Sequence, residues 1–164
     1  MELRHAVAGD AEAVFALRRA AILAGCASCY PADSLQRWTG GTASLAFAEA
    51  LAALGHVALQ DGVLVASGML DPTSGKIDAI FVDPAHMGQG LGRAMLAHLE
   101  RLARAAGLER IHLDATLNAV AFYRTCGFAG NTRAWYRSPR GIALECVPME
   151  KPLSLLVQPV TTSC

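Results

Sequence analysis

Three glycines at alternate positions connect an apolar strand to a long amphipathic helix. They are Gly88, Gly90 and Gly92, within residues 82–93, which read Val-Asp-Pro-Ala-His-Met-Gly-Gln-Gly-Leu-Gly-Arg. Glycine lets the main chain adopt positive φ and approach a ligand closely, and the first-turn N–H groups of a helix, with its dipole, favour an anion. The segment therefore predicts a site for an anion such as a pyrophosphate at the start of this helix.

Several kinds of site use a glycine-rich turn between a strand and a helix. A phosphate-loop NTPase is excluded because Gly-Lys-Ser/Thr is absent. A Rossmann dinucleotide site needs Gly-x-Gly-x-x-Gly in a parallel βαβ unit, whereas the spacing here is Gly-x-Gly-x-Gly and the preceding strands form a hairpin. Glycines that only allow close packing of helix on strand are the remaining alternative, although three in five positions exceed what packing needs.

Hydrophobic periodicity places this turn within a succession of strands and helices. An Asp-Gly pair at residues 61–62 predicts a hairpin between two apolar runs. Strands are predicted at residues 3–7, 56–59, 63–70, 76–82, 110–115, 135–136 and 142–146, and helices at residues 11–24, 44–54, 91–106 and 119–126. Residues 25–41 are rich in chain-breaking residues, with Asp33 as a cap for a short helix that reaches Trp38.

The order β-α-α-β-β-β-α-β-α-β-β predicts an α/β (α+β) layer fold. We expect a central mixed, mostly antiparallel sheet of six to seven strands, flanked by about four helices. Asp10 and Asn118 are predicted to cap the helices that follow them, and Gly107 and Gly127 to end the helices that precede them.

The chain has 164 residues, of which 53% are hydrophobic, and this suffices for one sizeable core. We therefore expect a single domain over residues 1–153. The tail, residues 154–164, is apolar but is interrupted by Pro159. An extra strand, an oligomer contact such as a homodimer, and disorder all stay open for it.

Charge gives no indication of a nucleic-acid partner. Fourteen Lys+Arg balance fourteen Asp+Glu, and no run of basic residues is present. The first five residues lack the basic-then-apolar order of a secretion signal, and no stretch is long and apolar enough to span a membrane. The expectation is a cytoplasmic protein that binds neither nucleic acid nor membrane.

The five cysteines are expected to be reduced packing residues. Their number is odd and no export signal accompanies them, which argues against a disulfide framework. Cys26 and Cys29 form a single C-x-x-C, and without a second pair or a spaced histidine nearby it gives only weak support for zinc or redox chemistry. No metal is expected.

Two motifs together resemble the GNAT superfamily of acyl-CoA-dependent N-acetyltransferases. The first is Val-x-Pro at residues 82–84 followed by the glycine turn and its helix. The second, about thirty residues later, is Asn118-x-x-Ala121-x-Tyr123-x-x-x-Gly-Phe. The segment Pro-Met-Glu-Lys-Pro-Leu at residues 148–153 also resembles the final strand of small bacterial members. The family usually has Arg or Gln where this chain has Met87, so weaker or altered cofactor binding is expected.

The resemblance implies that acetyl-CoA is the co-substrate. It would lie where the strands at residues 77–82 and 111–115 splay apart, with its pantetheine paired to main chain and its pyrophosphate on the amides of the glycine turn. The implied cofactor-binding residues are Ile80, Phe81, Val82, Met87, Gly88, Gln89, Gly90, Leu91, Gly92, Arg93, Asn118, Ala121 and Tyr123. Asn118 has a second interpretation as a plain helix cap. Arg93 and Arg124 are either partners of a cofactor phosphate or solvated charges.

The implied reaction is direct attack of a neutral amine on a thioester. Tyr123 is the candidate general acid for the leaving thiolate, the alternative being a core aromatic residue. An amine acceptor must lose a proton, so a base or a water chain is needed. Asp78 is the first candidate and His112 the second, and each has a structural alternative.

The predicted function is therefore an N-acetyltransferase that moves an acetyl group from acetyl-CoA to a primary amine. A catalytically inert acyl-CoA-binding sensor is the alternative, and an interaction protein that uses its apolar tail is a third hypothesis. The acceptor is a small-molecule or peptide amine, and near-neutral charge slightly favours a small or modestly charged one. Tyr30, Trp38 and Tyr136 are expected either to shape its pocket or to form ordinary core.

Overall fold

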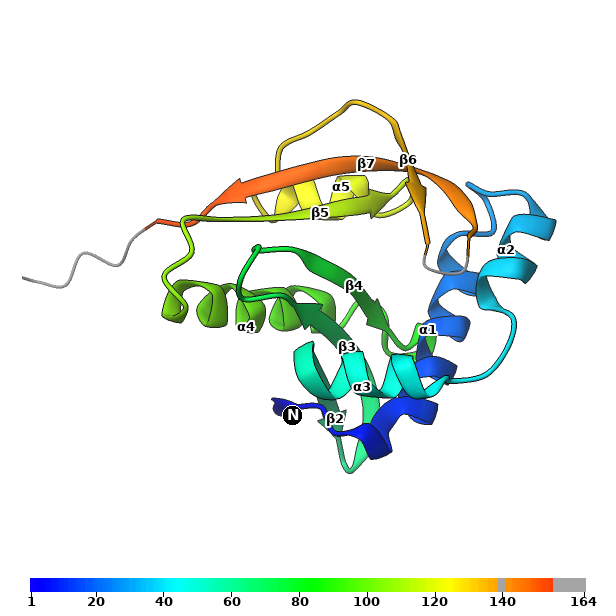
Figure 1. The fold of residues 1–164 in the computed structure, drawn as a ribbon, viewed down its shortest axis with the longest axis horizontal. Coiled ribbons are helices and arrows are strands. Elements are labelled where there is room, and N and C mark those ends of the chain that lie inside the picture. Colours follow the sequence, from blue (N-terminus) through cyan, green and yellow to red (C-terminus); the bar gives the residue numbers. More distant parts are fainter. Residues whose placement is uncertain (139–140, 155–164) are drawn as a thin grey trace, which may run out of the picture.

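The chain forms two antiparallel sheets that separate from each other like the arms of a V. The computed structural model describes residues 1–138 and 141–154. One sheet has the order β1-β2-β3-β4 and contains β1 (Glu2–His5), β2 (Gly55–Gln60), β3 (Val63–Leu70) and β4 (Ile77–Val82). The other has the order β5-β7-β6 and contains β5 (Arg110–Thr116), β6 (Ala134–Arg137) and β7 (Ala143–Pro152). Figure 1 shows β5 and β7 above β3 and β4.

The two sheets meet at only one end of the gap between β4 and β5. An isolated parallel bridge joins Lys76 to His112, and the amide of His112 donates to the Gly75 carbonyl at 3.0 Å. Beyond that point β4 pairs only with β3, and β5 only with β7, among the described strands. The pairing of β3 with β4 also shifts register between Ser67 and Met69. The predicted splay between these two strands is therefore present.

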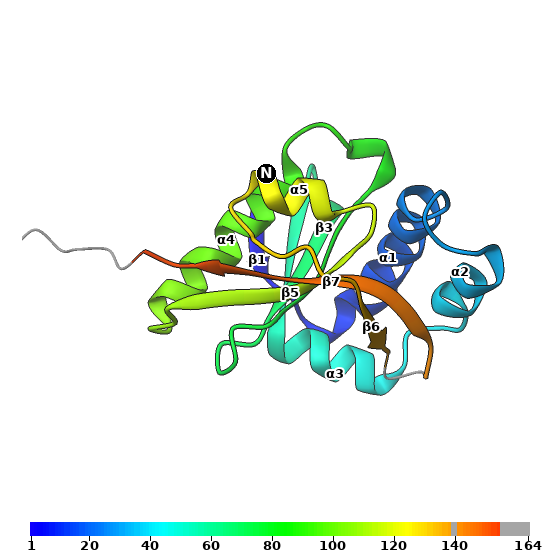
Figure 2. The ribbon, with the colours of Figure 1, turned by 90° about the horizontal axis from the view of Figure 1, so that it is seen from above.

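Helices cover both faces of the first sheet. The described helices are α1 (Ala11–Gly25), α2 (Ala32–Thr39), α3 (Leu45–Leu54), α4 (Leu91–Ala105) and α5 (Val120–Thr125), with short 3-10 turns at Ala8–Asp10 and Pro84–His86. Of these, α1, α3 and α4 contact the first sheet, α2 packs on α1, and α5 contacts β5. Figure 2 shows α4 and α1 on opposite sides of the strands. A Cβ at Gly68 of β3 would lie 3.0 Å from Met95 of α4, so glycine here lets helix and sheet approach closely.

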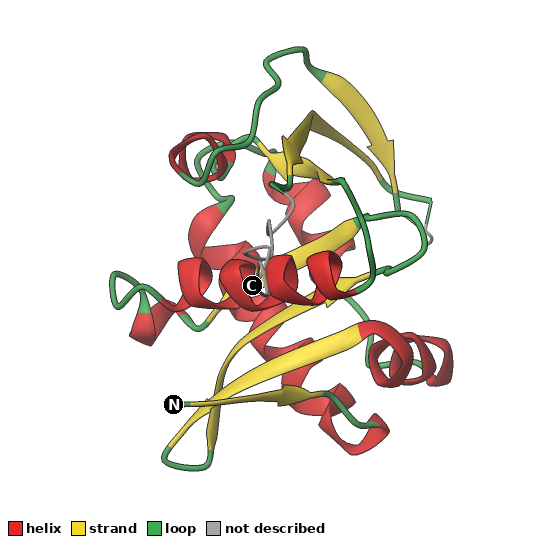
Figure 3. Cartoon of the chain, turned by 90° about the vertical axis from the view of Figure 1, so that its left-hand side faces the viewer, coloured by secondary structure: helices red, strands yellow, loops and turns green. Residues whose placement is uncertain are grey.

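The main core fills the space between α4, α5 and the two sheets. Its fully buried members include Val65 on β3, Met95 and Leu99 on α4, and Ile111 on β5. A second cluster, around Tyr30 and Trp38 of the α1–α2 region, packs against Leu144 of β7, and a third joins α1, α3 and β2. Figure 3 shows helices, in red, packed against the strands, in yellow. No described helix is both long and apolar enough to cross a bilayer.

The predicted α/β fold class is confirmed, and three details of it are corrected. The strands form two sheets instead of one central sheet. Three α-helices precede β2 instead of two, because residues 32–39 form a regular helix. The last strand is longer than predicted and continues to Pro152. The tail assigned to residues 154–164 lies, except for Ser154, outside the described residues.

The predicted helix ends are confirmed at glycine, but none of the three predicted side-chain caps forms. Gly107 and Gly127 follow α4 and α5 with φ of 79° and 95°. Asp10 occupies the predicted N-cap position of α1, but its side chain makes no capping hydrogen bond there, because its carboxylate is held by Arg4 and accepts the Val7 amide. Asp33 lies inside the first turn of α2 after the N-cap Pro31. The N-cap of α5 is Ala119, so Asn118 does not cap it.

Candidate active site

The three glycines of the turn have two different structural roles. Gly88 and Gly90 have φ of 80° and 77°, and a Cβ on either would meet no atom within 4 Å. Gly90 is the N-cap of α4, so open main chain lies directly at the start of a 15-residue helix. Gly92 has no positive φ, and a Cβ there would lie 3.4 Å from the Phe122 ring. The anion-site interpretation thus fits Gly88 and Gly90, whereas Gly92 lies inside α4 beside Phe122, where a Cβ would make only an ordinary contact.

The segment before these glycines is ordered by a short cap. Asp83 follows β4, and its carboxylate accepts the Ala85 amide at 2.9 Å, which starts the turn Pro84–His86. Met87 comes next and its side chain is 64% exposed. Gln89 and Arg93 are also exposed. The side chains of this turn therefore leave its main chain accessible to a ligand.

A cavity of about 680 Å³ opens between the splayed strands and the helices α1, α2 and α3. Four predicted site residues line it: Asp78, Ile80, Phe81 and Tyr123. The other predicted cofactor-binding residues, which are Val82, residues 87–93, Asn118 and Ala121, do not line it. The cavity extends along β4 from Ile77 to Phe81, and the glycine turn follows the end of that strand, so a long ligand could reach from one to the other.

Tyr123 is both a core residue and a cavity residue. Its side chain is 7% exposed and packs edge-on against Phe128, with ring centroids 5.5 Å apart. Burial raises the pKa of Tyr123 far above its usual value, with a smaller contribution from Cys126. Its hydroxyl has no hydrogen-bond partner among the described residues, and the hydroxyl oxygen is not completely shielded from solvent. The phenol is therefore a protonated donor at neutral pH that borders the cavity.

Of the two base candidates, the structure brings only Asp78 to this cavity. Asp78 lies opposite Met69 in the sheet and is exposed at the cavity edge. Its charge contributes to the raised pKa of Tyr136, after the larger effect of burial. His112 lies at the closed end of the splay, where its Nε2 is 3.1 Å from the Ser74 carbonyl oxygen, and it does not line the cavity.

An ion pair that the sequence did not indicate forms one wall of the cavity. Lys76 Nζ lies 2.5 Å from Asp114 Oδ2, which connects the start of β4 to β5. Both residues line the cavity. Alternation along β5 indicates that Asp114 shares a face with Thr116, but its partner is 38 residues earlier and no local pattern indicates it.

Asn118 is engaged inside the protein. Its Oδ1 accepts a hydrogen bond from the Cys26 thiol at 3.3 Å. Burial raises the pKa of Cys26 to about 11, so this thiol is a protonated donor. Among the described residues no group of three histidine, cysteine or acidic side chains is arranged to hold a metal ion. Within the pair Cys26 and Cys29, Cys26 thus has a structural role through its hydrogen bond to Asn118.

The three aromatic residues proposed for the acceptor pocket all line the cavity. Tyr30, Trp38 and Tyr136 come from the α1–α2 connection, α2 and β6. The Tyr30 hydroxyl donates to the Glu145 carbonyl at 2.5 Å and accepts the Leu117 amide at 3.1 Å. Tyr30 therefore fixes the α1–α2 connection to both β7 and the loop after β5, and it also serves the core.

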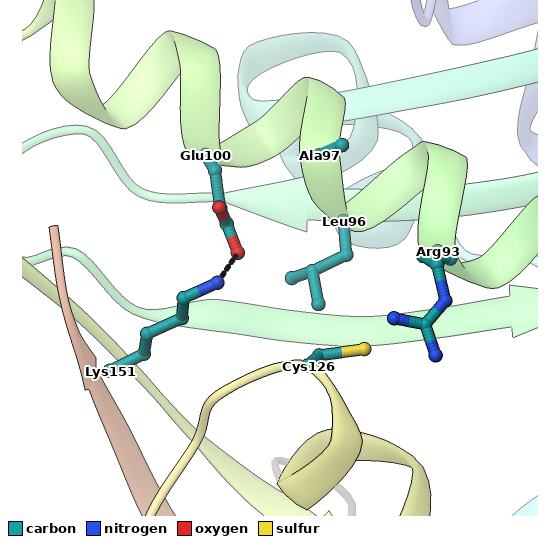
Figure 4. Close-up of a pocket in the computed structure, with 6 residues that line it drawn as sticks. All are labelled: Arg93, Leu96, Ala97, Glu100, Cys126 and Lys151. Atoms are coloured by element: carbon teal, nitrogen blue, oxygen red, sulfur yellow. Dashed lines mark hydrogen bonds and ion pairs between the residues drawn. The ribbon is translucent and has the colours of Figure 1, made fainter.

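The two arginines proposed as phosphate partners lie on the outer side of α4 and α5. Arg93 donates to Thr125 Oγ1 at 3.3 Å, and Arg124 donates to the Gly130 carbonyl at 3.4 Å. Arg93 also borders a small pocket of about 140 Å³. Figure 4 shows this pocket, with Cys126 below α4 and the ion pair of Glu100 with Lys151 at its far side. Both arginines are exposed.

Comparison with known proteins assigns the family. The family model described as acetyltransferase (GNAT) family matches residues 28–128, which is more than half of the chain. The chain therefore belongs to the GNAT acetyltransferase family. This match includes the glycine turn and the segment that contains Tyr123.

Curated relatives match over parts of their length. Glucosamine 6-phosphate N-acetyltransferase of Trypanosoma brucei brucei is 34% identical over 59 residues, which cover 36% of this chain and 40% of that protein. IAA acetyltransferase of Azospirillum brasilense is 33% identical over 104 residues, covering 59% of this chain and 66% of that protein. The chain thus spans less than two thirds of the length of these relatives.

Solved structures match over nearly the whole chain. A protein from Rhodopseudomonas palustris, described as a GCN5-related N-acetyltransferase and as Aminotransferase, Class-II, has a TM-score of 0.85 and 28% identity, covering 93% of this chain and 95% of that one. PaiA N-acetyltransferase of Thermoplasma acidophilum, solved with coenzyme A, has a TM-score of 0.69 and 18% identity, covering 92% and 98%. The latter likeness concerns the fold alone.

Proposed function

We propose that this protein is an N-acetyltransferase that transfers an acetyl group from acetyl-CoA to a primary amine by direct attack. Membership of the GNAT acetyltransferase family supports the reaction class, and the coenzyme A in the PaiA structure supports the co-substrate. The observation that carries the proposal is that Tyr123 and Asp78 border one cavity at the splay of β4 and β5. An inert sensor would have no need of a proton donor and an acceptor in the same cavity.

The co-substrate would be held along β4 and at the start of α4. The amides of residues 87–93 would bind its pyrophosphate, and the fit is supported by the open space at Gly88 and Gly90. The main chain from Ile80 to Val82 has no strand partner on the β5 side and would pair with the pantetheine arm. Ala121 would line this path. Asn118 would contribute only if it exchanged its bond with Cys26 for one to the arm.

The chain's own residues would handle the two protons of the reaction. Asp78 would accept a proton from the incoming ammonium, directly or through one water, so that the amine attacks in its neutral form. Tyr123 would donate its proton to the departing thiolate, whose conjugate thiol has a pKa of about 8.5 as a free group, and the second proton that the nitrogen loses as the amide forms would restore the phenol. Because burial keeps Tyr123 protonated, the donor is present throughout the neutral pH range.

The first experiment combines binding with turnover. Calorimetric titration is expected to show that acetyl-CoA binds, and amine-dependent release of CoA, measured chromatographically because the chain has its own thiols, is expected to follow. Tyr123→Phe should lower kcat about 100-fold and leave acetyl-CoA binding intact, since a general acid typically contributes this much. Tyr136→Phe, which removes another hydroxyl from the same cavity, is the matched control and should retain most of the turnover.

The outcomes separate the two functions weighed for this chain. Binding of acetyl-CoA without turnover on any amine would favour the inert sensor. Absence of binding would remove both. Equal turnover by wild type and Tyr123→Phe would reject the assigned acid while the enzyme class stood.

Three expectations from the sequence stay predictions. They are the domain limit at residue 153, a cytoplasmic location, and a role of the tail in a homodimer. Gel filtration of the full chain and of a chain ending at Leu153 tests the last of these, because loss of a dimer on truncation would assign the contact to the tail.

A further inference from the structure

The wall of the cavity on the helix side consists of aromatic and aliphatic side chains. Phe15 of α1 and Phe47 of α3 meet edge-on with ring centroids 5.7 Å apart, and both line the cavity. Trp38 of α2 adds a third ring, which packs edge-on against Tyr30 at 5.9 Å. Met69 of β3 and Leu51 of α3 complete this side. A ligand that enters here would place an apolar body against several ring faces and edges.

The cavity has charged groups on both sides. Arg18 of α1 lies against the rings, with its Cζ 5.6 Å from the Phe15 centroid and a hydrogen bond of 3.5 Å to the Trp38 carbonyl. On the strand side, Lys76 is paired with Asp114, and Glu145 lies 3.6 Å from Arg133. Asp78 lines the cavity and has no ion-pair partner in residues 1–138 and 141–154. The strand side therefore keeps one unbalanced carboxylate, next to the phenol of Tyr136, which favours a positive group on the part of the ligand that faces it.

We propose that the acceptor is a primary amine attached through a short linker to an aromatic ring system of one or two rings. Its ammonium would face Asp78, and its ring would pack in the compartment bordered by Phe15, Trp38 and Phe47. The inference rests on the proposed function and names its substrate class. A volume of about 680 Å³ suits a body of this size together with the thioester end of the co-substrate.

The same features disfavour other classes of amine. A polyamine carries several charges, and its second ammonium would enter the apolar compartment without a counter-charge, which is unfavourable. A sugar phosphate would place several hydroxyl groups against the rings of Phe15, Trp38 and Phe47, which offer them no conventional hydrogen bonds. The glucosamine 6-phosphate named for one relative is therefore not the acceptor expected here.

Two alanines on α3 provide a matched pair of variants. Ala46 and Ala53 are both exposed, but only Ala46 lines the cavity. Ala46→Trp would fill the apolar compartment from a surface position, so it does not depend on removing core. Ala53→Trp adds the same side chain to the same helix outside the cavity. Circular dichroism checks that both variants are folded.

The experiment measures binding and turnover separately. 2-Phenylethylamine is titrated calorimetrically into the protein saturated with CoA. We expect binding that weakens at least tenfold in Ala46→Trp and is unchanged in Ala53→Trp. In turnover with acetyl-CoA, kcat/KM for 2-phenylethylamine should exceed that for spermidine, glucosamine 6-phosphate and an alanyl tripeptide at least 100-fold.

The results distinguish failure of this inference from failure of the proposed function. Turnover that prefers spermidine, the sugar phosphate or the peptide would overturn the acceptor class and leave the acetyltransferase standing. Equal binding to both tryptophan variants would also overturn it, because the ring would then not occupy the compartment. If acetyl-CoA does not bind, the proposed function fails, and titration of 2-phenylethylamine into the unliganded variants still decides whether the compartment accepts the ring.

Discussion

At the scale of single residues, the glycine turn shows what one local pattern predicts and what it cannot. The left-handed conformations at Gly88 and Gly90 belong to the turn itself and follow from the local sequence. The contact of Gly92 with Phe122 depends on a helix 30 positions later, so no inspection of residues 88–92 could indicate it. The same holds for Asn118, whose motif implied a contact with the cofactor and whose local position suggested a cap, while its observed partner is Cys26.

Substitution at the turn should separate binding from packing. Gly90→Ala places a Cβ on a residue with φ of 77° and into the space open to an anion, so acetyl-CoA affinity should fall about tenfold, with about 1 kcal/mol lost in stability. Gly92→Ala places its Cβ in ordinary contact with Phe122 at a helical position, so it should keep or slightly raise stability with little change in affinity. Calorimetric titration and thermal melts measure the two quantities. A similar loss of affinity in both variants would contradict the division of roles.

The buried face of His56 makes stability depend on pH. Burial, followed by the charges of His98 and His5, lowers the pKa of His56 to about 4. His98 Nε2 on α4 lies 3.1 Å from His56 Nδ1, and Arg101 of the same helix approaches His98. In the unfolded chain His56 therefore becomes protonated near pH 6.5, whereas in the folded protein it stays neutral down to about pH 4. The free energy of unfolding should fall as pH drops through this window.

A pair of variants tests the histidine contribution. Between pH 7 and pH 5 we expect a loss of about 1 kcal/mol, a small value because the ring is partly exposed. His56→Gln should flatten this part of the stability profile. His112→Gln replaces a histidine far from the cluster and should leave the slope of stability against pH unchanged. Chemical denaturation at each pH gives the free energies, and an unchanged slope in His56→Gln would refute the assignment.

At the scale of elements, a side chain can cap a helix only if it is free to accept a hydrogen bond from the first amides of that helix. A side chain that is bound by another residue does not form the cap. Asp10 is a good cap residue by composition, yet Arg4 binds its carboxylate with two hydrogen bonds of 2.8 and 3.0 Å. Arg4 thereby lowers the pKa of Asp10. Ser44 has no such competitor, and its hydroxyl accepts the Phe47 amide at 3.1 Å. The positions of helices were predictable from periodicity, whereas caps depended on partners from other elements.

The α3 and α2 helices offer a direct comparison of a cap with a first-turn acid. Ser44→Ala removes the bond to the Phe47 amide and should lower the free energy of unfolding by about 1 kcal/mol. Asp33→Ala removes only an exposed ion pair with Arg37, at 3.8 Å, and should cost less than about 0.5 kcal/mol. Urea titration measures both. A larger loss in Asp33→Ala would show that Asp33 caps α2 after all.

At the scale of the whole molecule, the sequence predicted the fold class and most of the strands and helices, but neither the third helix before β2 nor the division into two sheets. Each strand was recognisable from its own residues, while the separation of β4 from β5 depends on how α4 and α5 fill the angle between the sheets. The cavity residues Asp78 and Tyr123 were found because a family motif or a strand pattern marked them. Lys76 with Asp114, and the ring wall formed with Phe15 and Phe47, arise only when distant segments meet.

One buried ion pair ties the two halves together. Glu100 on α4 is 8% exposed, and its Oε1 lies 2.7 Å from Nζ of Lys151 on β7. Glu100→Gln should therefore destabilise the protein by about 2 kcal/mol, because Lys151 would lose its counter-charge. Combining it with Lys151→Met should restore part of that loss. A double-mutant cycle by urea denaturation measures the coupling, and additive effects would show that the pair does not link the sheets.

The splay between β4 and β5 has a consequence for the life of the chain before it meets a ligand. Each strand carries, on its inner side, a row of amides and carbonyls that no neighbouring strand satisfies beyond the bridge at Lys76. An unsatisfied strand edge is a template for pairing with another chain. On the proposed function, a co-substrate along β4 would act as a temporary strand and hide this template. The opening between β4 and β5 is thus a place where another chain could pair during synthesis, and a bound co-substrate would protect the protein from such pairing.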